Sequence, residues 1–571
     1  MRKLPLLAVL LSAAALLGSG CAELSPEEIA KLGLPPEVLP TPPKVRIGDS
    51  MDVLTSSSAP QAVPKADPAV LSALFELLEK SDSIRPDLKA VAGTPFEELL
   101  KVGSPDGFRL RNRYLYPGVP LAEALAADPD PALRERLVRL ARWERSAEVR
   151  ATALIALARL KDLQDERVLN EALAHHDPAV RFGAMEALLS WGHPEKAVPL
   201  LKLAAENDVS PLLRVYAAGG MARLGGAGGL EKLRGFLSTS PDWVGRAMAA
   251  HALGDYGEGK DYDVFLDRLD RDGANEFLSA EYAIAALKIF GRREAAPPPV
   301  PAPGGTGTGN TPGGPGLASS LTADLDFMLE PIVITAPREH IAQETLVDPR
   351  INALLLRLLE QKSALRPEEA GSQNSAAALF AELTTLTGHM LSLRYSELGF
   401  LLTEGLAGVK DFGIQNRLEA VSRSGKNPPM RAAALVALGH AKDDRFFPLF
   451  QEALRDVSLT VRLGGLESVV LSASPAALFT LGDAAQNDPS FTVKGMAAAE
   501  YWQRGNLAGR EALWRMTTET DWYARAEAVY HLGRLGGADE YRKLMDMLGR
   551  ETDPIVRAEL ALALVRLGRF K

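Results

Sequence analysis

Apolar positions recur with helical spacing in a series of similar segments along the chain. In the segment that begins at Val149, apolar residues fall at positions 149, 153, 156, 157 and 160, which places them on one face of a helix. Asp177-Pro178 and Asp553-Pro554 each precede such a segment. In both, the aspartate is suited to cap a helix and the proline to occupy its first turn. The pattern predicts short, well-delimited helices.

A basic residue returns near the start of these segments at an almost constant interval. The residues are Arg150, Arg181, Arg214, Arg246, Arg431, Arg462, Lys494, Arg525 and Arg557. Successive position numbers differ by 31, 33 and 32 in the first series and, from Arg431 on, by 31, 32, 31 and 32 in the second. A period of this length indicates a solenoid, because one helix pair cannot bury its apolar face until a neighbouring pair covers it.

The second half of the chain repeats the first. With an offset that falls from 281 to 279 along the chain, the matched dipeptides are Asp67-Pro68 with Asp348-Pro349, Arg113-Tyr114 with Arg394-Tyr395, Val180-Arg181 with Val461-Arg462, and Asp242-Trp243 with Asp521-Trp522. Between the halves, Pro297–Gly316 contains seven prolines and seven glycines, too few apolar residues to form a core. We therefore predict an all-α fold: an α-solenoid of two duplicated arrays, residues 67–292 and 348–571, joined by a disordered linker, residues 293–347.

The N-terminus has the pattern of an export signal. Arg2-Lys3 precedes the apolar run Leu4–Leu17, and Gly18-Ser19-Gly20 leads into Cys21, the single cysteine of the chain. The arrangement resembles a bacterial lipoprotein signal, residues 1–20, whose cleavage would expose Cys21 for lipid attachment. The alternative is an ordinary secretory signal with an incidental cysteine. Residues 21–66 are rich in proline and are predicted to be a membrane tether. Ala22 resembles the residue that sorts lipoproteins to the outer membrane, which implies a periplasm-facing protein.

The repeating segments resemble HEAT repeats, in particular the phycobilisome-lyase-like variety. The resemblance rests on an aspartate four residues before an arginine, in the pairs Asp177 and Arg181, Asp242 and Arg246, Asp521 and Arg525, and Asp553 and Arg557. It covers residues 130–291 and 428–571, whereas residues 67–129 and 348–427 do not match and are interpreted as variant or capping regions. The resemblance implies that these aspartates and arginines form a structural ladder between successive repeats. An anion-binding stripe is the alternative.

Two further sets of residues are candidates for partner binding. Arg159, Arg223, Arg534 and Arg566 lie in the last turn of predicted helices. A cation there interacts favourably with the helix dipole, or it could contact an acidic partner at the edge of the solenoid. Trp243 and Trp522 each follow an aspartate at a helix start. We expect them to pack against the preceding repeat, with an exposed anchor for a partner as the alternative.

No arrangement of residues indicates catalysis. His175-His176-Asp177 is a poor metal site because adjacent histidines point in different directions and Asp177 is needed as a cap. No nucleophile arrangement or phosphate-binding loop is recognisable, and the net charge of −9 argues against a nucleic-acid partner. We therefore expect no enzyme activity, no cofactor and no metal.

The sequence thus predicts a lipid-anchored scaffold that binds protein partners. Two alternatives stay open: a bilin-lyase-like or other enzyme-associated HEAT protein, and an accessory lipoprotein of an envelope secretion or motility complex. Glu330–Arg338 resembles the TonB box of outer-membrane transporters. Helical repeats follow it here instead of a plug and barrel, which excludes a transporter. An extended segment that a partner pairs with by strand addition is the alternative to packing along the second array.

Overall fold

The computed structural model describes residues 67–80, 93–100, 113–115, 117–125, 131–271, 275–295, 348–360, 398–472 and 474–568, and the single residues 86, 388, 391, 394 and 395. These residues all belong to one compact unit, Val63–Lys571. Every regular element within them is a helix, which confirms the predicted all-α fold. The signal segment, Cys21, the tether up to residue 66, residues 296–347 of the linker and the TonB-box-like stretch lie outside the described residues.

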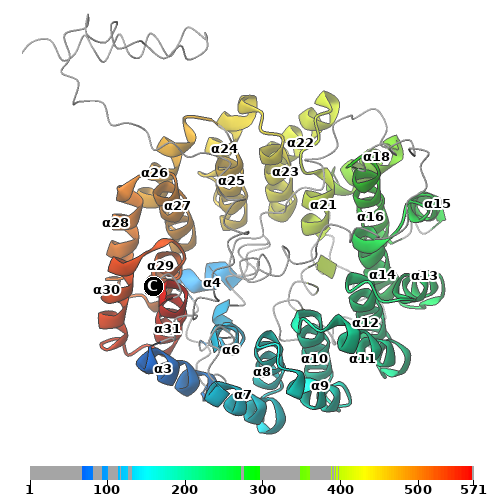
Figure 1. Ribbon diagram of the computed structural model, residues 1–571. Helices are drawn as coiled ribbons and strands as arrows, with labels where there is room; N and C mark the ends of the chain where they lie inside the picture. Colours follow the sequence, from blue (N-terminus) through cyan, green and yellow to red (C-terminus); the bar gives the residue numbers. More distant parts are fainter. Residues whose placement is uncertain are drawn as a thin grey trace, which may run out of the picture. The chain divides into compact units, whose positions relative to one another are not determined.

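Both arrays are series of short antiparallel helices (Figure 1). The helices of array 1 are α3 (Pro68–Glu79), α4 (Pro95–Leu100), α6 (Gly118–Leu125), α7 (Pro131–Trp143), α8 (Ala147–Arg159), α9 (Glu166–Leu173), α10 (Pro178–Ser190), α11 (Pro194–Asn207), α12 (Pro211–Arg223), α13 (Gly229–Thr239), α14 (Trp243–Tyr256), α15 (Asp261–Arg271) and α16 (Glu276–Ala295). The last of these extends to Ala295, three residues into the segment predicted as linker.

Array 2 follows the same plan. Its helices are α18 (Pro349–Glu360), α21 (Leu398–Leu406), α22 (Phe412–Ser424), α23 (Pro428–His440), α24 (Phe447–Ala453), α25 (Leu459–Leu471), α26 (Ala477–Asn487), α27 (Phe491–Gln503), α28 (Leu507–Met516), α29 (Trp522–Leu535), α30 (Ala538–Leu548) and α31 (Pro554–Gly568). Short 3-10 turns at Leu163–Asp165 and Asp444–Phe446 occupy equivalent places in the two arrays.

The helices form two layers, and their composition differs accordingly (Figure 1). Helices of the inner layer are buried on nearly all sides; in α10, every residue from Ala179 to Leu188 is buried, including the charged Arg181 and Glu186. Helices of the outer layer are amphipathic; α9 buries only Val168, Leu169 and Ala172. An amphipathic outer helix covers one side of the inner helix, and the neighbouring repeats cover the other sides. This arrangement is the α-solenoid that the periodic pattern predicts.

Glycine allows successive inner helices to approach closely at equivalent places in the arrays. A Cβ atom placed on Gly183 of α10 would lie 2.5 Å from the Cβ of Ala151 in α8. Gly464 of α25, the counterpart of Gly183 in array 2, stands in the same relation to Ala432 of α23, at 2.8 Å. Both distances are too short for any side chain to be added without moving a helix.

The two arrays contact each other at both of their ends. At the end of array 1, α16 contacts α18 and α21 of array 2. At the end of array 2, α31 contacts α3 and α6 of array 1. The four helices α3, α6, α18 and α21 belong to residues 67–129 and 348–427, the regions interpreted from the sequence as variant or capping regions. These regions therefore join the arrays. The contacts between inner helices therefore form a closed ring (Figure 1).

Candidate functional site

Two of the predicted ladder arginines, Arg181 and Arg525, connect one repeat to the next. Arg181 donates from Nε to Asp208, at 2.9 Å, and from Nη2 to the same carboxylate, at 3.1 Å. Its Nη1 donates to the carbonyl oxygens of His175, at 3.0 Å, and His176, at 2.9 Å. Asp208 begins the loop of the following repeat, where its carboxylate also accepts from the backbone N–H of Ser210, at 2.8 Å. One arginine thus holds two loops of successive repeats together.

The same contact recurs in array 2. Arg462 donates to Asp488 at 3.1 Å, and Arg525 donates to Glu551 at 2.9 and 3.1 Å. Arg431 donates to Asp456 at 2.5 Å. The spacing from arginine to acid is 25 to 27 residues in these rungs. The sequence motif places an aspartate four residues before each arginine, whereas Arg181 and Arg525 pair in the structure with an acid of the next repeat.

The predicted ladder aspartates cap their own helices. Asp177, Asp242 and Asp521 each accept from a backbone N–H two residues later, at 2.8, 3.0 and 2.8 Å. Asp553 accepts from the N–H groups of two residues, at 2.9 and 3.1 Å. The paired arginine then donates to nearby backbone carbonyls, as Arg246 does to the carbonyl of Ser240 at 2.9 Å. The aspartate therefore caps the helix, whereas the arginine holds the backbone of the same loop.

The two histidines beside Asp177 contact each other and the backbone of their own loop. The rings of His175 and His176 lie 4.1 Å apart between centroids, and Nδ1 of His175 accepts from the backbone N–H of Asp177 at 3.1 Å. Among the described residues, no group of three or more histidine, cysteine, aspartate or glutamate side chains is placed to hold a metal ion.

None of the helices in the described ranges is both long and apolar enough to span a membrane.

The two arrays meet at a first junction, where the tail of array 1 (α14 and α16) contacts the head of array 2 (α18, α21, Arg394 and Tyr395). Nη2 of Arg394 donates to Oε1 of Glu281 on α16 at 2.8 Å, and Nη1 donates to Oε2 of Glu404 on α21 at 2.7 Å. Lys288 bridges Glu404, at 2.9 Å, and Asp255, at 2.8 Å. The junction is therefore a continuous, buried network of opposite charges.

The electrostatics of this network favour the ionised carboxylates. Burial alone would raise the pKa of Glu404, but Arg394, Lys288 and His251 hold it well below its usual range. Burial also opposes ionisation of Glu281, and Arg394 and His251 again lower its pKa. A network of this kind is stable only while all partners are present, because each charge is costly to leave buried alone.

The second junction lies where the tail of array 2 (α29 and α31) contacts the head of array 1 (α3, α4, α6, Arg113 and Tyr114). Arg113 donates to both carboxylate oxygens of Glu559, from Nη2 at 2.8 Å and from Nε. The hydroxyl of Tyr114 donates to Glu527 at 2.9 Å. The guanidinium of Arg113 also lies 4.7 Å from the ring centroid of Tyr530. The contact combines a charge pair with aromatic packing.

Both candidate tryptophans belong to the junctions. The ring of Trp243 lies 5.6 Å from that of Phe277 in the next repeat and 6.3 Å from that of Tyr395 in the other array. Trp522 lies 5.0 Å from Phe96 and 5.9 Å from Tyr114, both in array 1. The sequence analysis expected packing against the preceding repeat; the ring contacts of both tryptophans reach the other array, and Trp243 also contacts the following repeat.

The four candidate arginines do not share one surface. Arg223 is exposed and Arg159 is half-buried. Arg534 pairs with Glu500 at 3.7 Å. Arg566 is only 8% exposed, with its guanidinium 5.3 Å from the ring of Tyr530. Burial and repulsion by Arg113 lower the pKa of Arg566 to about 10. Its place in the second junction removes it from any free edge, because α31 is covered there by array 1.

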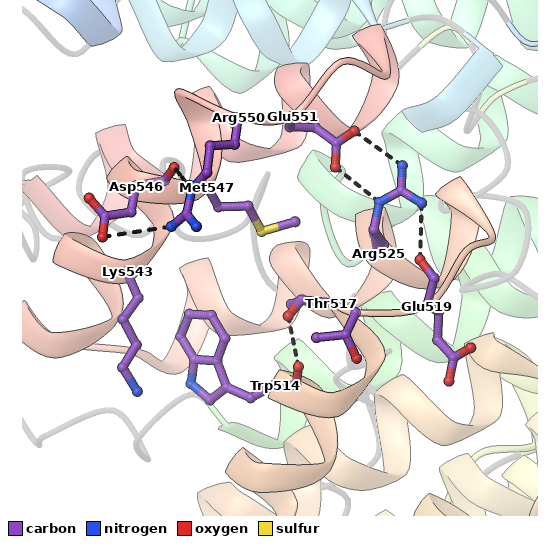
Figure 2. A pocket seen from close by; sticks show the side chains of 10 residues that line it. Trp514, Thr517, Glu519, Arg525, Lys543, Asp546, Met547, Arg550 and Glu551 are labelled. Atoms are coloured by element: carbon purple, nitrogen blue, oxygen red, sulfur yellow. Dashed lines mark hydrogen bonds and ion pairs between the residues drawn. The ribbon is translucent and has the colours of Figure 1, made fainter.

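A surface pocket of about 540 Å³ lies between α28 and α30 in array 2. Figure 2 shows the indole of Trp514 and the side chain of Lys543 on one side and the Arg525–Glu551 pair on the other, with Met547 between them. Nζ of Lys543 lies 5.0 Å from the centroid of the indole. The volume is within the range of about 300–1,000 Å³ that is usual for ligand pockets.

Polar groups in this pocket are left with unused hydrogen-bonding capacity. Nε1 of Trp514 is buried and has no hydrogen-bond acceptor among the described residues. Lys543 is exposed, and the contact of its ammonium group that the structure shows is with the ring of Trp514. At the equivalent places in array 1, with an offset of 279, the sequence has Gly235 and Val264. The pocket was not predicted from the sequence, although Trp514 and Lys543 differ there from their counterparts in array 1.

Comparison with known families identifies the repeats. A family model of HEAT repeats matches residues 137–214, 198–288 and 480–565. These matches fall in both arrays, so the chain contains HEAT-repeat domains. No curated protein matches the sequence.

The fold is similar to that of solved karyopherin structures. Kap121p bound to the extreme C-terminus of the protein phosphatase Cdc14p matches with 12% sequence identity and a TM-score of 0.32, over 87% of this chain and 50% of that chain. Kap121p bound to RanGTP matches with 12% identity and a TM-score of 0.31, over 87% and 49%. The chain thus spans about half the length of these structures.

Proposed function

We propose that the protein is a non-catalytic scaffold that binds a protein partner in the pocket between α28 and α30. The observation that carries the proposal is the pairing of Trp514 with Lys543 in a pocket of about 540 Å³. A Trp ring next to an exposed lysine is suited to a peptide segment with an apolar side chain beside a carboxylate. The apolar group would pack on Trp514 and Met547, and the carboxylate would pair with Lys543.

A HEAT solenoid suits this function because its repeats present a large surface without a catalytic centre. One solved Kap121p structure is bound to the extreme C-terminus of the protein phosphatase Cdc14p. The support for a peptide ligand is the grouping of Trp514, Met547 and Lys543 in the pocket.

Site-specific photo-crosslinking in cells tests the pocket. A photoreactive amino acid at Thr518, on the exposed rim of the pocket, should give an adduct with a partner protein. Trp514→Ala and Lys543→Glu should each reduce the yield of that adduct at least about tenfold, since interface anchors of this type contribute about 2 kcal/mol or more.

The matched control is the same photoreactive residue at Gly235 of α13. This position is the counterpart of Trp514 in array 1, and a Cβ atom built there meets nothing within 4 Å. An adduct from Gly235 with none from Thr518, or an adduct unaffected by both substitutions, would show that the pocket is not the binding site.

We also propose that the scaffold is anchored to the outer membrane by lipid at Cys21 and faces the periplasm. The support is the order of the basic residues, the apolar run and the small residues before the single cysteine. Wild-type protein should incorporate labelled fatty acid, and Cys21→Ser should neither incorporate it nor remain in the membrane fraction. Wild-type protein that carries no lipid by mass spectrometry would leave the ordinary secretory signal as the correct interpretation.

A further inference from the structure

The two junctions correspond to each other residue by residue. Arg113 and Arg394 are counterparts with an offset of 281, and Glu281 and Glu559, which they contact, are counterparts with an offset of 278. Nη2 of each arginine donates to its glutamate at 2.8 Å, in the pairs Arg113–Glu559 and Arg394–Glu281. Such buried, bidentate pairs fix both the orientation and the register of an interface.

The aromatic contacts and the helices correspond as well. Tyr114 lies 5.9 Å from Trp522 in the second junction, and Tyr395 lies 6.3 Å from Trp243 in the first. The contacts of α31 with α3 and α6 are matched by those of α16 with α18 and α21. The ring is thus built like a two-fold symmetric dimer, with head and tail surfaces that are common to both arrays.

We propose that these surfaces also fit a second copy of this chain. The tail of array 1 can bind the head of array 1 from another molecule, in place of the head of array 2 that it contacts in the ring. The exchange keeps the central contact, because Arg113 then meets Glu281, as Arg394 does now. By the same argument the tail of array 2 can take the head of another array 2, with Arg394 against Glu559.

The residues that differ between the tails decide how strong the exchanged contact is. Glu527, which accepts from Tyr114, corresponds to Met248 in array 1, so exchange loses this hydrogen bond and the exchanged pair is the weaker one. Lys288 of array 1 corresponds to Arg566 of array 2, so a cation is kept. Asp255 corresponds to Arg534, so a carboxylate takes the place of a cation in array 1, and His251 takes the place of the Tyr530 ring that lies against Arg113. In the intact chain the linker gives the other array a large advantage in local concentration, so exchange requires that the linker be cut.

The experiment uses two full-length preparations with different tags on array 1 and a protease site inserted in the glycine-rich stretch of residues 304–314. They are mixed, the linker is cut, and one tag is captured after incubation. We expect array 2 to remain bound to array 1 after cleavage, and the second tag to be captured together with the first. Uncut protein is the control and should give no capture of the second tag.

A charge-reversed chain separates the two kinds of pairing. In Arg113→Glu/Glu559→Arg, the pairing of array 1 with array 2 keeps opposite charges at both junctions. Pairing of two copies of array 1 instead places Glu against Glu281, and pairing of two copies of array 2 places Arg against Arg394. Capture of the second tag should therefore fall at least about 100-fold, since like charges across an interface cost several kcal/mol.

Three results would overturn the proposal. Separation of the cut halves would show that the junctions are not binding surfaces. Halves that stay together without capture of the second tag from wild-type protein would show that each tail discriminates between the two heads. Equal capture from the wild-type and charge-reversed proteins would show that pairing does not depend on Arg113 and Glu559. None of these results bears on the pocket between α28 and α30, whose function is tested separately.

Discussion

Replacing Arg181 by alanine tests whether the ladder stabilises the solenoid. Arg181 is 6% exposed and makes two hydrogen bonds to Asp208 and two to backbone carbonyls. The side chain of Asp208 is only 2% exposed. Without the arginine, its carboxylate keeps one of the observed partners, the backbone N–H of Ser210 at 2.8 Å. The substitution therefore leaves a buried charge without a counter-ion.

Removal of one member of a buried charge pair costs about 3–5 kcal/mol, because the remaining charge is still withheld from water. Arg167 is the matched control: its side chain is 83% exposed and it pairs with Glu171 one helical turn away. Loss of such an exposed pair costs about 0.3–0.5 kcal/mol. We expect Arg181→Ala to lower the free energy of unfolding by several times as much as Arg167→Ala.

Urea denaturation followed by circular dichroism measures both values, provided that the slope of the transition is unchanged. The double variant Arg181→Ala/Asp208→Asn adds a second test, because removing the charge should recover part of the loss. Equal destabilisation by Arg181→Ala and Arg167→Ala, or no recovery in the double variant, would refute the assignment of Arg181–Asp208 as a stabilising rung.

Two further predictions concern packing and pH. Gly183→Val should destabilise the protein by about 1–3 kcal/mol in the same assay, since its Cβ atom would lie 2.5 Å from that of Ala151; an unchanged midpoint would contradict the close approach. Burial raises the pKa of Asp165 to about 6, although Arg134 opposes the shift. The folded state therefore binds this proton more tightly than the unfolded state, and the contribution of Asp165 to stability falls as the pH rises from about 4 to about 6. The stability difference between Asp165→Asn and wild type should shift in favour of the variant by about 2–3 kcal/mol over this range, and a difference independent of pH would contradict the raised pKa.

Local signals in the sequence were sufficient to predict the helices. Asp177-Pro178 marks the start of α10, and Asp553-Pro554 marks the start of α31. These predictions succeed because capping and the proline ring act within a few residues of the chain. The partner of Arg181 could not be predicted from local signals, because Asp208 lies 27 residues away and contacts Arg181 only when two loops stack.

The contact between the arrays was missed for a related reason. Arg113 and Glu559 are separated by 446 residues, and no local pattern reports a contact of that range. One signal was present: Arg113-Tyr114 is duplicated as Arg394-Tyr395 in the part of each array that lacks the HEAT motif. Both copies keep an arginine followed by a tyrosine at a place where the HEAT motif requires neither residue. Such a pair indicates a contact outside the repeat.

Closure of the ring changes how the repeats can unfold. An open solenoid of n repeats has n − 1 interfaces, and a terminal repeat can melt after losing only one of them. In the ring, where α31 meets α6 and α16 meets α21, n repeats share n interfaces and every repeat has two neighbours. The first repeat to unfold must then break two interfaces at once, so fraying from the ends is abolished. Because the rotations of all repeats must add up to one full turn, a change of curvature in any repeat must also be compensated elsewhere in the ring.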